Sequence, residues 1–334
     1  MSNVAASPFS QVDSIQGNFY GKDIISLDQF AVEDLFEVFH LALHMKQLVQ
    51  NSQPSQLLAG KIISLLFFEP SSRTFGSFAS AVKRLGGQTL DIQNPEMVTS
   101  VNKGESFEDT IRVFEAYSDA IVLRHPRSGA ARVAAEAAQF VPILNAGDGT
   151  NEHPSQTLLD LCTLYEQFGR LDHLSGLLAG DALNSRTMHS LMRGLSLFPG
   201  NRLYILAPPK LRLTRDDYVH ISSRGVELIE LCSENEIPPD CNFWYWTRIQ
   251  KERFSSMEEY LELAAEKFVV TPELLTRRAS RDMILMDPLP RVGTIDPAVD
   301  RDERAVYLRS QIRNGLYTRM ALLALVLSPY PLAN

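Results

Sequence analysis

Short aliphatic runs alternate with longer segments of helical period along this chain, and no other feature of the sequence restricts its fold as strongly. A parallel sheet is buried by helices on both faces, so its strands appear as brief apolar runs separated by helices. The alternation therefore predicts an α/β protein. The predicted strands are residues 62–68, 119–123, 141–145, 174–179, 202–206, 242–246 and 283–286.

Segments with a helical hydrophobic period lie before and between these runs. The chain has 334 residues, of which 45% are apolar, which is enough for two ordinary cores. Two domains are therefore expected, with a single large domain as the alternative. The predicted helices are residues 27–49, 74–85, 129–140, 154–168, 186–197, 256–268 and 302–327.

Charge and cysteine content exclude several classes of protein. The net charge is −8 and the basic residues form no stripe, which argues against nucleic acid as a partner. Cys162, Cys232 and Cys241 have neither disulfide-framework nor zinc-finger spacing, as expected in a reducing cytosol. The polar first twenty residues and the short apolar stretch 320–327 predict neither export nor membrane insertion.

The clearest polar cluster lies where the predicted strand 62–68 ends and the helix 74–85 begins. Hydroxyl groups of Ser71, Ser72 and Thr74 flank Arg73 there. A helix N-terminus presents free backbone N–H groups and the positive end of the helix dipole, so it favours anions. The segment is a candidate phosphate site, and the alternative is a serine cap beside a solvent-facing arginine.

Two loops could complete such a site. The loop 99–106 carries Thr99 and Lys103, and this lysine could cover a bound anion or simply be solvated. A second loop, 145–153, places His153 and Gln156 at the start of a predicted helix. A neutral histidine can donate to a carbonyl oxygen, and a glutamine offers a donor and an acceptor to an amide. Alternatively, His153 is only a helix cap.

Four arginines share one place in the pattern, since each lies at or just past the end of a predicted strand. Ligands of doubly wound sheets bind outside these carboxyl ends, and arginine holds carboxylate or phosphate through paired hydrogen bonds. The repetition predicts one polyanionic site, although any of these arginines alone could be an ordinary surface residue. They are Arg73, Arg124, Arg186 and Arg248.

Two more strand ends carry distinctive residues. Gly180-Asp181 follows a strand, but no G-x-G-x-x-G fingerprint is present, so a dinucleotide site is disfavoured. Pro288 and Pro290 favour extended backbone after the strand 283–286, which turns carbonyl oxygens outward as acceptors.

Taken together and in their order along the chain, these motifs resemble those of the catalytic chain of the aspartate carbamoyltransferases, over about residues 21–327. The resemblance implies two doubly wound parallel-sheet lobes: a carbamoyl-phosphate-binding domain (1–153 and 312–334) and an aspartate-binding domain (154–311). The matching segments are 71–74 (S-T-R-T in the family), 103–105 (K-G-E), 124–126 (R-H-P), 145–156 (N-A-G-D-G to H-P-x-Q), 247–253 (T-R-x-Q-K-E-R) and 288–291 (P-L-P-R).

The resemblance implies that the carbamoyl group passes from carbamoyl phosphate to the amino group of L-aspartate, an early step of de novo pyrimidine synthesis. Segment 71–74 and Arg124 would hold the phosphate, while Thr74, Arg124 and His153 would polarise the carbonyl oxygen. The implied catalytic residues are Arg73, Thr74, Lys103, Arg124 and His153.

The other implied substrate contacts fall into two groups. Gln156 and the carbonyl groups of Leu289 and Pro290 would receive the carbamoyl amide. The aspartate carboxylates would be bound by Arg186, Arg248 and Gln250. The full implied set is Ser71, Ser72, Arg73, Thr74, Thr99, Lys103, Arg124, His153, Gln156, Arg186, Arg248, Gln250, Leu289 and Pro290.

The resemblance also concerns assembly and cofactors. Lys103 would enter the site of a neighbouring subunit, which implies a homotrimer with shared active sites. The expected location is the cytoplasm, in agreement with the cysteine pattern. Regulatory chains or other pathway enzymes are candidate partners. No metal or organic cofactor is implied, because an amine attacks a carbonyl whose leaving group is phosphate, and positioning with charge stabilisation suffices.

Several positions depart from the family pattern. Thr99 stands where the family has serine, which keeps a hydroxyl group. Phe75 and Leu183 replace an arginine and a lysine, and Asp287 replaces a histidine and should weaken anion binding unless it is paired or protonated. These changes motivate one alternative, a low-activity paralogue that serves as a ligand-binding or assembly subunit. A carbamoyltransferase for another amino acid, such as ornithine, is a second alternative, although its loop normally reads H-C-L-P.

Overall fold

A computed structural model describes residues 13–95, 103–149, 151–251, 254 and 256–329. The chain divides into unit 1 (Met1–Ser155 and Leu316–Asn334) and unit 2 (Gln156–Gly315). It passes between the units near the start of helix α6 (Pro154–Phe168) and again within α11 (Ser310–Leu327).

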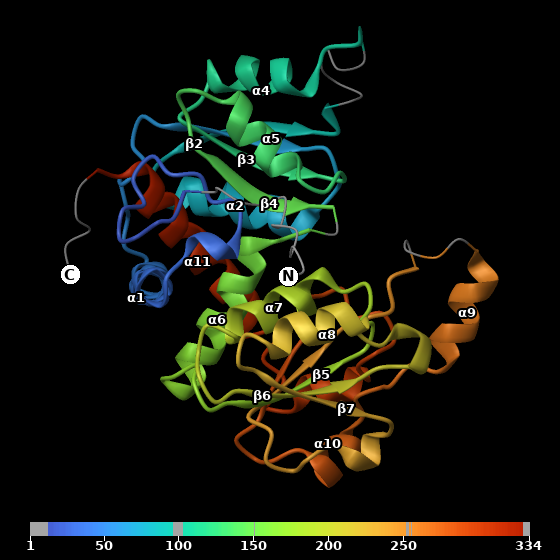
Figure 1. Ribbon diagram of the computed structural model, residues 1–334. Coiled ribbons are helices and arrows are strands. Elements are labelled where there is room, and N and C mark those ends of the chain that lie inside the picture. The colour runs from blue at the N-terminus through green and yellow to red at the C-terminus, as the bar shows by residue number, and fades with distance from the viewer. Residues whose placement is uncertain (1–12, 96–102, 150, 252–253, 255, 330–334) are drawn as a thin grey trace, which may run out of the picture. The chain divides into compact units, whose positions relative to one another are not determined.

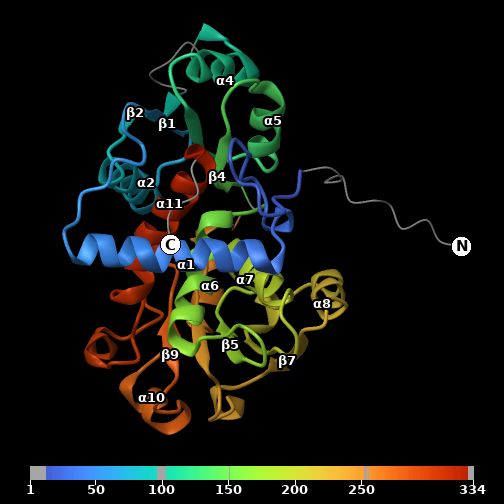
Figure 2. The ribbon, with the colours of Figure 1, turned by 90° about the vertical axis from the view of Figure 1, so that its left-hand side faces the viewer.

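Unit 1 contains a four-stranded parallel sheet in the order β2-β1-β3-β4. Helices α4 (Phe107–Glu115) and α5 (Ala130–Ala137) cover one face, and α2 (Ser72–Arg84) and α11 lie on the other (Figures 1 and 2). Helix α1 (Val32–Gln50) belongs to the same unit. The strands are β1 (Ile62–Phe67), β2 (Gln88–Gln93), β3 (Ala120–His125) and β4 (Ile143–Asp148).

Apolar side chains at helical spacing fix the outer layer of unit 1. Ile111 and Phe114 of α4, with Ala134 and Ala137 of α5, are buried against the central strands in one cluster. Small alanine side chains let α5 approach the sheet closely, and burial of this cluster supplies the hydrophobic stabilisation that short helices need.

Unit 2 contains a five-stranded parallel sheet in the order β7-β6-β5-β8-β9. Helices α6, α7 (Arg186–Leu195) and α8 (Arg215–Ser222) lie on one face, and α10 (Pro272–Arg278) lies on the other (Figure 1). Helix α9 (Met257–Ala265) follows β8 in the chain. The strands are β5 (Ser175–Ala179), β6 (Arg202–Leu206), β7 (Glu227–Leu231), β8 (Phe243–Trp246) and β9 (Ile284–Met286).

The predicted fold class, two doubly wound parallel-sheet lobes, is confirmed, and each of the seven predicted strands is present. Two strands, β2 and β7, were not predicted. Both lie at sheet edges and are only partly buried, so their sequences QTLDIQ and ELIEL lack the continuous apolar run of a central strand.

The helix predicted for 302–327 is wrong in its first third, since α11 begins at Ser310. The preceding backbone extends the sheet instead: Leu285 N–H of β9 donates to Arg304 C=O, and Val306 N–H donates back to Leu285 C=O. Helices α4, α8 and α10 were not predicted, and all three have nine residues or fewer. No described helix has the length and apolar character needed to cross a bilayer.

Candidate functional site

The start of α2 forms the centre of the candidate site in unit 1. Ser71 occupies the N-cap position in extended backbone, but its side chain accepts no capping hydrogen bond. Ser72 and Arg73 are exposed and Thr74 is buried. The cap alternative therefore does not account for the Ser71 hydroxyl, and the first turn presents hydroxyls, backbone N–H groups and a guanidinium together.

Arg124 is brought beside this turn by strand pairing. It lies opposite Phe67 in the register of β1 with β3, and Phe68 N–H donates to its carbonyl oxygen at 2.8 Å. Its guanidinium is buried, donates to Ala146 C=O at 3.1 Å and pairs with Glu69 at 2.8 Å. Burial lowers the pKa of Arg124. The negative charge of Glu69 opposes this shift, and the positive charge of Arg73 adds to it. The cation is thus held by fixed partners rather than free at the surface.

His153 reaches the same place from the loop after β4. Its Nε2 lies 3.5 Å from Thr74 Oγ1, its Nδ1 lies 3.4 Å from Ser155 Oγ, and its ring is buried. These contacts place an imidazole donor or acceptor beside the first turn of α2. Four of the predicted catalytic residues, Arg73, Thr74, Arg124 and His153, therefore belong to one site in unit 1.

The loop that carries His153 is organised by a buried carboxylate, Asp148. It accepts hydrogen bonds from Asn145 Nδ2 at 3.0 Å and from the backbone N–H groups of Gly129 and Glu152 at 2.9 and 3.2 Å. Glu152 in turn accepts from Ser26 Oγ and Leu27 N–H. Several residues of the 145–156 motif thus have a scaffolding role, which fixes the direction in which His153 enters the site.

Arg319 of α11 is a site neighbour that sequence reasoning missed. It is buried, donates to Ser77 Oγ at 3.0 Å and Ser155 Oγ at 3.4 Å, and lies over the Phe78 ring at 5.1 Å. Arg319 and His153 both contact the hydroxyl of Ser155, so Arg319 adds a positive charge close to His153. A lone arginine directly before the apolar run 320–327 was the available sequence signal.

Lys103, which the resemblance predicts to reach a neighbouring subunit, lies on the loop before α4. Lys103 is exposed and, within the described part of the chain, makes no hydrogen bond or ion pair. Thr99 lies outside the described residues. Of the positions that depart from the family pattern, Phe75 packs edge-to-face on Phe67 with ring centres 5.2 Å apart, so it contributes to the core under the site.

Unit 2 groups the predicted aspartate ligands at the ends of β5 and β8, which are neighbours in its sheet. Arg186 is the first residue of α7, after the cap Ser185, and is partly exposed. Arg248 and Gln250 directly follow β8, and Gln250 Nε2 donates to Asn184 C=O at 3.0 Å. Two cations and an amide therefore sit on adjacent strand ends, as a dicarboxylate would require.

A buried aspartate, Asp181, ties these two strand ends together. It accepts from the backbone N–H groups of Asn184 at 3.0 Å and Gln250 at 3.3 Å. Burial raises the pKa of Asp181 while these hydrogen bonds oppose the shift. Asp181 of the Gly-Asp pair thus holds the backbone after β5 and the backbone after β8 together.

The segment 287–290 follows β9 in unit 2. Asp287 is buried, its Oδ1 accepts from Leu289 N–H at 2.5 Å, and its own N–H donates to Gln311 Oε1 at 3.0 Å. One oxygen of the carboxylate is therefore held by backbone, which fixes the position of this side chain in the loop. Leu289 packs on the unit 2 core and Pro290 is exposed.

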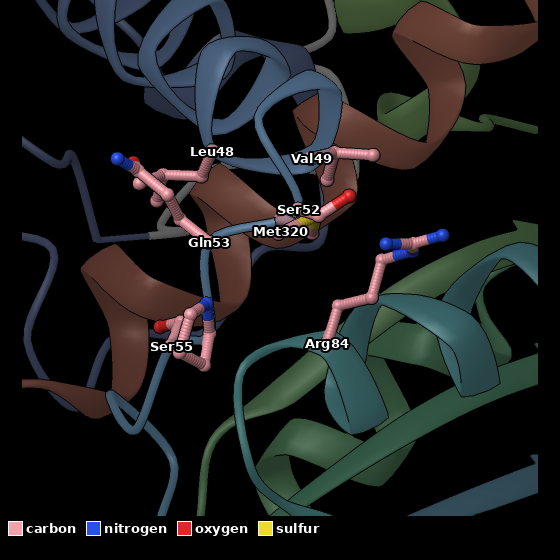
Figure 3. Close-up of a pocket in the computed structure, with 8 residues that line it drawn as sticks. Leu48, Val49, Ser52, Gln53, Ser55, Arg84 and Met320 are labelled. Carbon is pink, nitrogen blue, oxygen red and sulfur yellow. The ribbon is translucent and has the colours of Figure 1, made fainter.

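A separate pocket of about 280 Å³ lies elsewhere in unit 1 (Figure 3). No predicted site residue lines it, so it is distinct from the cluster at the start of α2. The pocket is lined by Leu48, Val49, Ser52, Gln53, Pro54, Ser55, Arg84 and Met320.

No group of three or more His, Cys, Asp or Glu side chains with metal-site geometry occurs among the described residues.

His125, at the end of β3, makes the stability of unit 1 depend on pH. Its ring contacts the rings of Phe68 and Phe107, with centres 4.7 and 5.0 Å apart, and its Nδ1 accepts from Arg127 N–H at 2.9 Å. Burial, reinforced by Arg127, lowers the pKa of His125 from 6.5 to about 4. The folded state therefore holds this ring neutral at pH values where the unfolded chain binds a proton.

We expect this contribution to be intact above pH 6.5 and lost as the pH falls towards 4. The ring is partly exposed and water screens it, so the loss should be roughly 1–2 kcal/mol. Urea unfolding of the unaltered chain and His125→Asn at pH 7 and 5 measures it. The variant should lose less stability between the two pH values, and identical pH dependence would refute the assignment.

Comparison with known proteins decides the family. The model of the aspartate/ornithine carbamoyltransferase carbamoyl-P binding domain matches residues 22–166, and the model of the Asp/Orn binding domain matches residues 173–326. The chain belongs to the aspartate/ornithine carbamoyltransferase family. The resemblance inferred from the motifs is therefore confirmed.

Individual relatives agree with this family. The aspartate carbamoyltransferase catalytic subunit of Thermococcus gammatolerans is 44% identical over 92% of this chain and 98% of its own length. The multifunctional protein pyr1-3 of Dictyostelium discoideum is also 44% identical over 92% of this chain, which spans 13% of that protein. A structure of aspartate transcarbamoylase from Trypanosoma cruzi with carbamoyl phosphate and aspartate is 36% identical, with a TM-score of 0.86 over 95% of this chain and all of that chain.

Proposed function

We propose that this chain transfers the carbamoyl group of carbamoyl phosphate to the amino group of L-aspartate, giving N-carbamoyl-L-aspartate and phosphate, an early step of de novo pyrimidine synthesis. The observation that carries the proposal is the meeting of Arg124, Thr74 and His153 at the first turn of α2. This arrangement suits a ligand with a phosphate and a neighbouring carbonyl group.

The donor half of the reaction follows from the chemistry of these groups. The start of α2, with Ser71, Ser72 and Arg73, would bind the phosphate, and Arg124 would bridge phosphate and carbonyl oxygen. Negative charge develops on that oxygen when the amine attacks. Preorganised donors from Thr74, Arg124 and His153 would stabilise it, and the departing phosphate would accept the amine proton.

The remaining substrate contacts are assigned to unit 2. The two carboxylates of the acceptor, aspartate, would be held by Arg186, Arg248 and Gln250. The NH₂ group of the donor, carbamoyl phosphate, would be received by Gln156 and the carbonyl groups of Leu289 and Pro290. The Trypanosoma cruzi relative, whose structure contains carbamoyl phosphate and aspartate, supports this choice of substrates.

The proposal extends to the assembly. We assign carbamoyl-phosphate binding to residues 1–153 with 312–334 and aspartate binding to residues 154–311, and place the protein in the cytoplasm. A homotrimer in which Lys103 enters a neighbouring site would give the exposed Lys103 a ligand. Multifunctional relatives favour association with other pathway enzymes, and regulatory chains are a further candidate partner.

A low-activity paralogue is the alternative function, and it is motivated by Phe75, Leu183 and Asp287. Phe75 packs against Phe67, and Asp287 Oδ1 accepts from the Leu289 N–H, so neither position removes a proposed ligand. We therefore prefer the active enzyme to a subunit used only for ligand binding or assembly.

An acceptor competition tests the proposed substrate. The purified chain is incubated with carbamoyl phosphate and equal concentrations of L-aspartate and L-ornithine, and both carbamoylated products are quantified by mass spectrometry. We expect N-carbamoyl-L-aspartate without citrulline. Citrulline as the main product would assign the site to ornithine, because Arg186 and Arg248 would then not face a dicarboxylate.

A further inference from the structure

Asp160 lies at the centre of a buried hydrogen-bond network in unit 2 that the proposed reaction does not yet use. It is fully buried on α6, one turn after Gln156. Gln156 Nε2 donates to its Oδ1 at 3.1 Å and its Oδ2 at 3.2 Å. Tyr245 Oη of β8 also donates to Oδ2 at 2.9 Å. A buried carboxylate with this many donors fixes the side chains around it.

The same carboxylate is connected to the loop after β9 through Gln311. Gln311 Nε2 donates to Asp160 Oδ1 at 2.8 Å, and its Oε1 accepts from Asp287 N–H at 3.0 Å. Asp287 then accepts from Leu289 N–H at 2.5 Å. A chain of hydrogen bonds, buried at its centre and partly buried at its ends, therefore links Gln156 with Leu289, two of the groups assigned to the carbamoyl amide.

The direction of each amide in this network is set by the chemistry of its partners. Both oxygens of Asp160 act as acceptors here, so the Nε2 groups of Gln156 and Gln311 point towards this carboxyl group. Burial and the nearby Asp160 raise the pKa of Tyr245 well above its usual value, so its hydroxyl stays a donor. The oxygen of Gln156 is then the end that can accept from a ligand.

We propose that Asp160 is a positioning residue that makes the site select an acyl phosphate bearing an NH₂ group. It orients the Gln156 oxygen and, through Gln311, the backbone at Leu289 as acceptors for the two N–H bonds of the carbamoyl group. The inference rests on the proposed function. Acetyl phosphate, which has a methyl group in that place, gains nothing from these acceptors.

The test compares carbamoyl phosphate with acetyl phosphate in Asp160→Asn. The new amide presents N–H to one of the donors that face Asp160, which favours a flipped Gln156 with its NH₂ towards the ligand. We expect the KM for carbamoyl phosphate to rise roughly 10-fold, as for one lost and one mismatched hydrogen bond. The inhibition constant of acetyl phosphate should change less than about twofold.

Two further variants make the result decisive. Asp302→Asn removes a carboxylate of unit 2 that pairs with Arg304 outside this network, and it should leave both constants unchanged. Gln311→Met breaks the link to Asp287 while keeping Asp160, so it tests the proposal even when Asp160→Asn does not fold. It should also raise the KM for carbamoyl phosphate more than the inhibition constant of acetyl phosphate.

The outcomes separate the two proposals. If Asp160→Asn weakens the binding of carbamoyl phosphate and acetyl phosphate equally, Asp160 has a general structural role. Gln311→Met gives the same test if the first variant does not fold. This result would overturn the inference and leave the proposed function standing. An unchanged KM for carbamoyl phosphate would do the same. If the unaltered chain forms no N-carbamoyl-L-aspartate, the proposed function itself fails, and the inference fails with it.

Discussion

Replacing Arg73 with alanine is expected to lower kcat/KM at least about 100-fold, a cost of roughly 3 kcal/mol in transition-state stabilisation. The guanidinium stands in the first turn of α2, where it would bind the phosphate as charge moves onto it. Because Arg73 is exposed and alanine is a strong helix former, the stability of the fold should change by less than about 0.5 kcal/mol.

The matched control for Arg73→Ala is Lys83→Ala. Lys83 is also an exposed cation of α2, but it lies in the last turn, at the opposite end of the helix from the candidate phosphate site. Steady-state kinetics should show near-normal activity for the control. Near-normal activity for Arg73→Ala as well would remove this arginine from the site and leave the anion assignment of α2 without its main cation.

Replacing Gly180 with alanine is expected to destabilise unit 2 by about 3 kcal/mol or more. Gly180 follows β5 with φ +118°, and a Cβ there would lie 2.0 Å from the carbonyl oxygen of Thr247, just after β8. The overlap is with backbone, so no side-chain rotation relieves it. The ends of β5 and β8 would have to separate, and with them Arg186 and Arg248.

Gly169→Ala separates the cost of a positive φ from the cost of the overlap with Thr247, which are both present in Gly180→Ala. Gly169 is also in unit 2 and has φ +68°, but nothing lies within 4 Å of a Cβ at that position. The control should therefore show only the cost of left-handed backbone, about 1 kcal/mol. Urea unfolding of both variants checks this. Equal destabilisation would mean that the close approach of Thr247 does not constrain this strand end.

The central strands and long helices could be predicted because their residues are buried on a regular period. The edge strands β2 and β7 are half polar, and their pairing depends on strands distant in sequence, so no local pattern reveals them. The short helices α4, α8 and α10 had a readable signal in their caps. Ser106, Thr214 and Thr271 each accept a hydrogen bond from the backbone N–H of the third residue of the helix that follows.

Residues at strand ends could be assigned from the motifs, whereas the groups that hold them could not. Asp148 and Asp160 act through partners that are buried with them, and Gln311 lies 151 residues from Asp160 in the sequence. Arg319 reaches Ser155 across 164 residues. Such pairings follow from tertiary packing, which is why the sequence predicts the site residues but not the network that orients them.

The most direct test of the account is formation of N-carbamoyl-L-aspartate and phosphate by the purified chain from carbamoyl phosphate and L-aspartate, with both products quantified in one reaction. We predict equal amounts of the two products, and no carbamoylated product from Arg73→Ala above about one hundredth of the normal rate. Phosphate release without N-carbamoyl-L-aspartate, or no reaction at saturating substrates, would contradict the proposal that this chain is an active aspartate carbamoyltransferase.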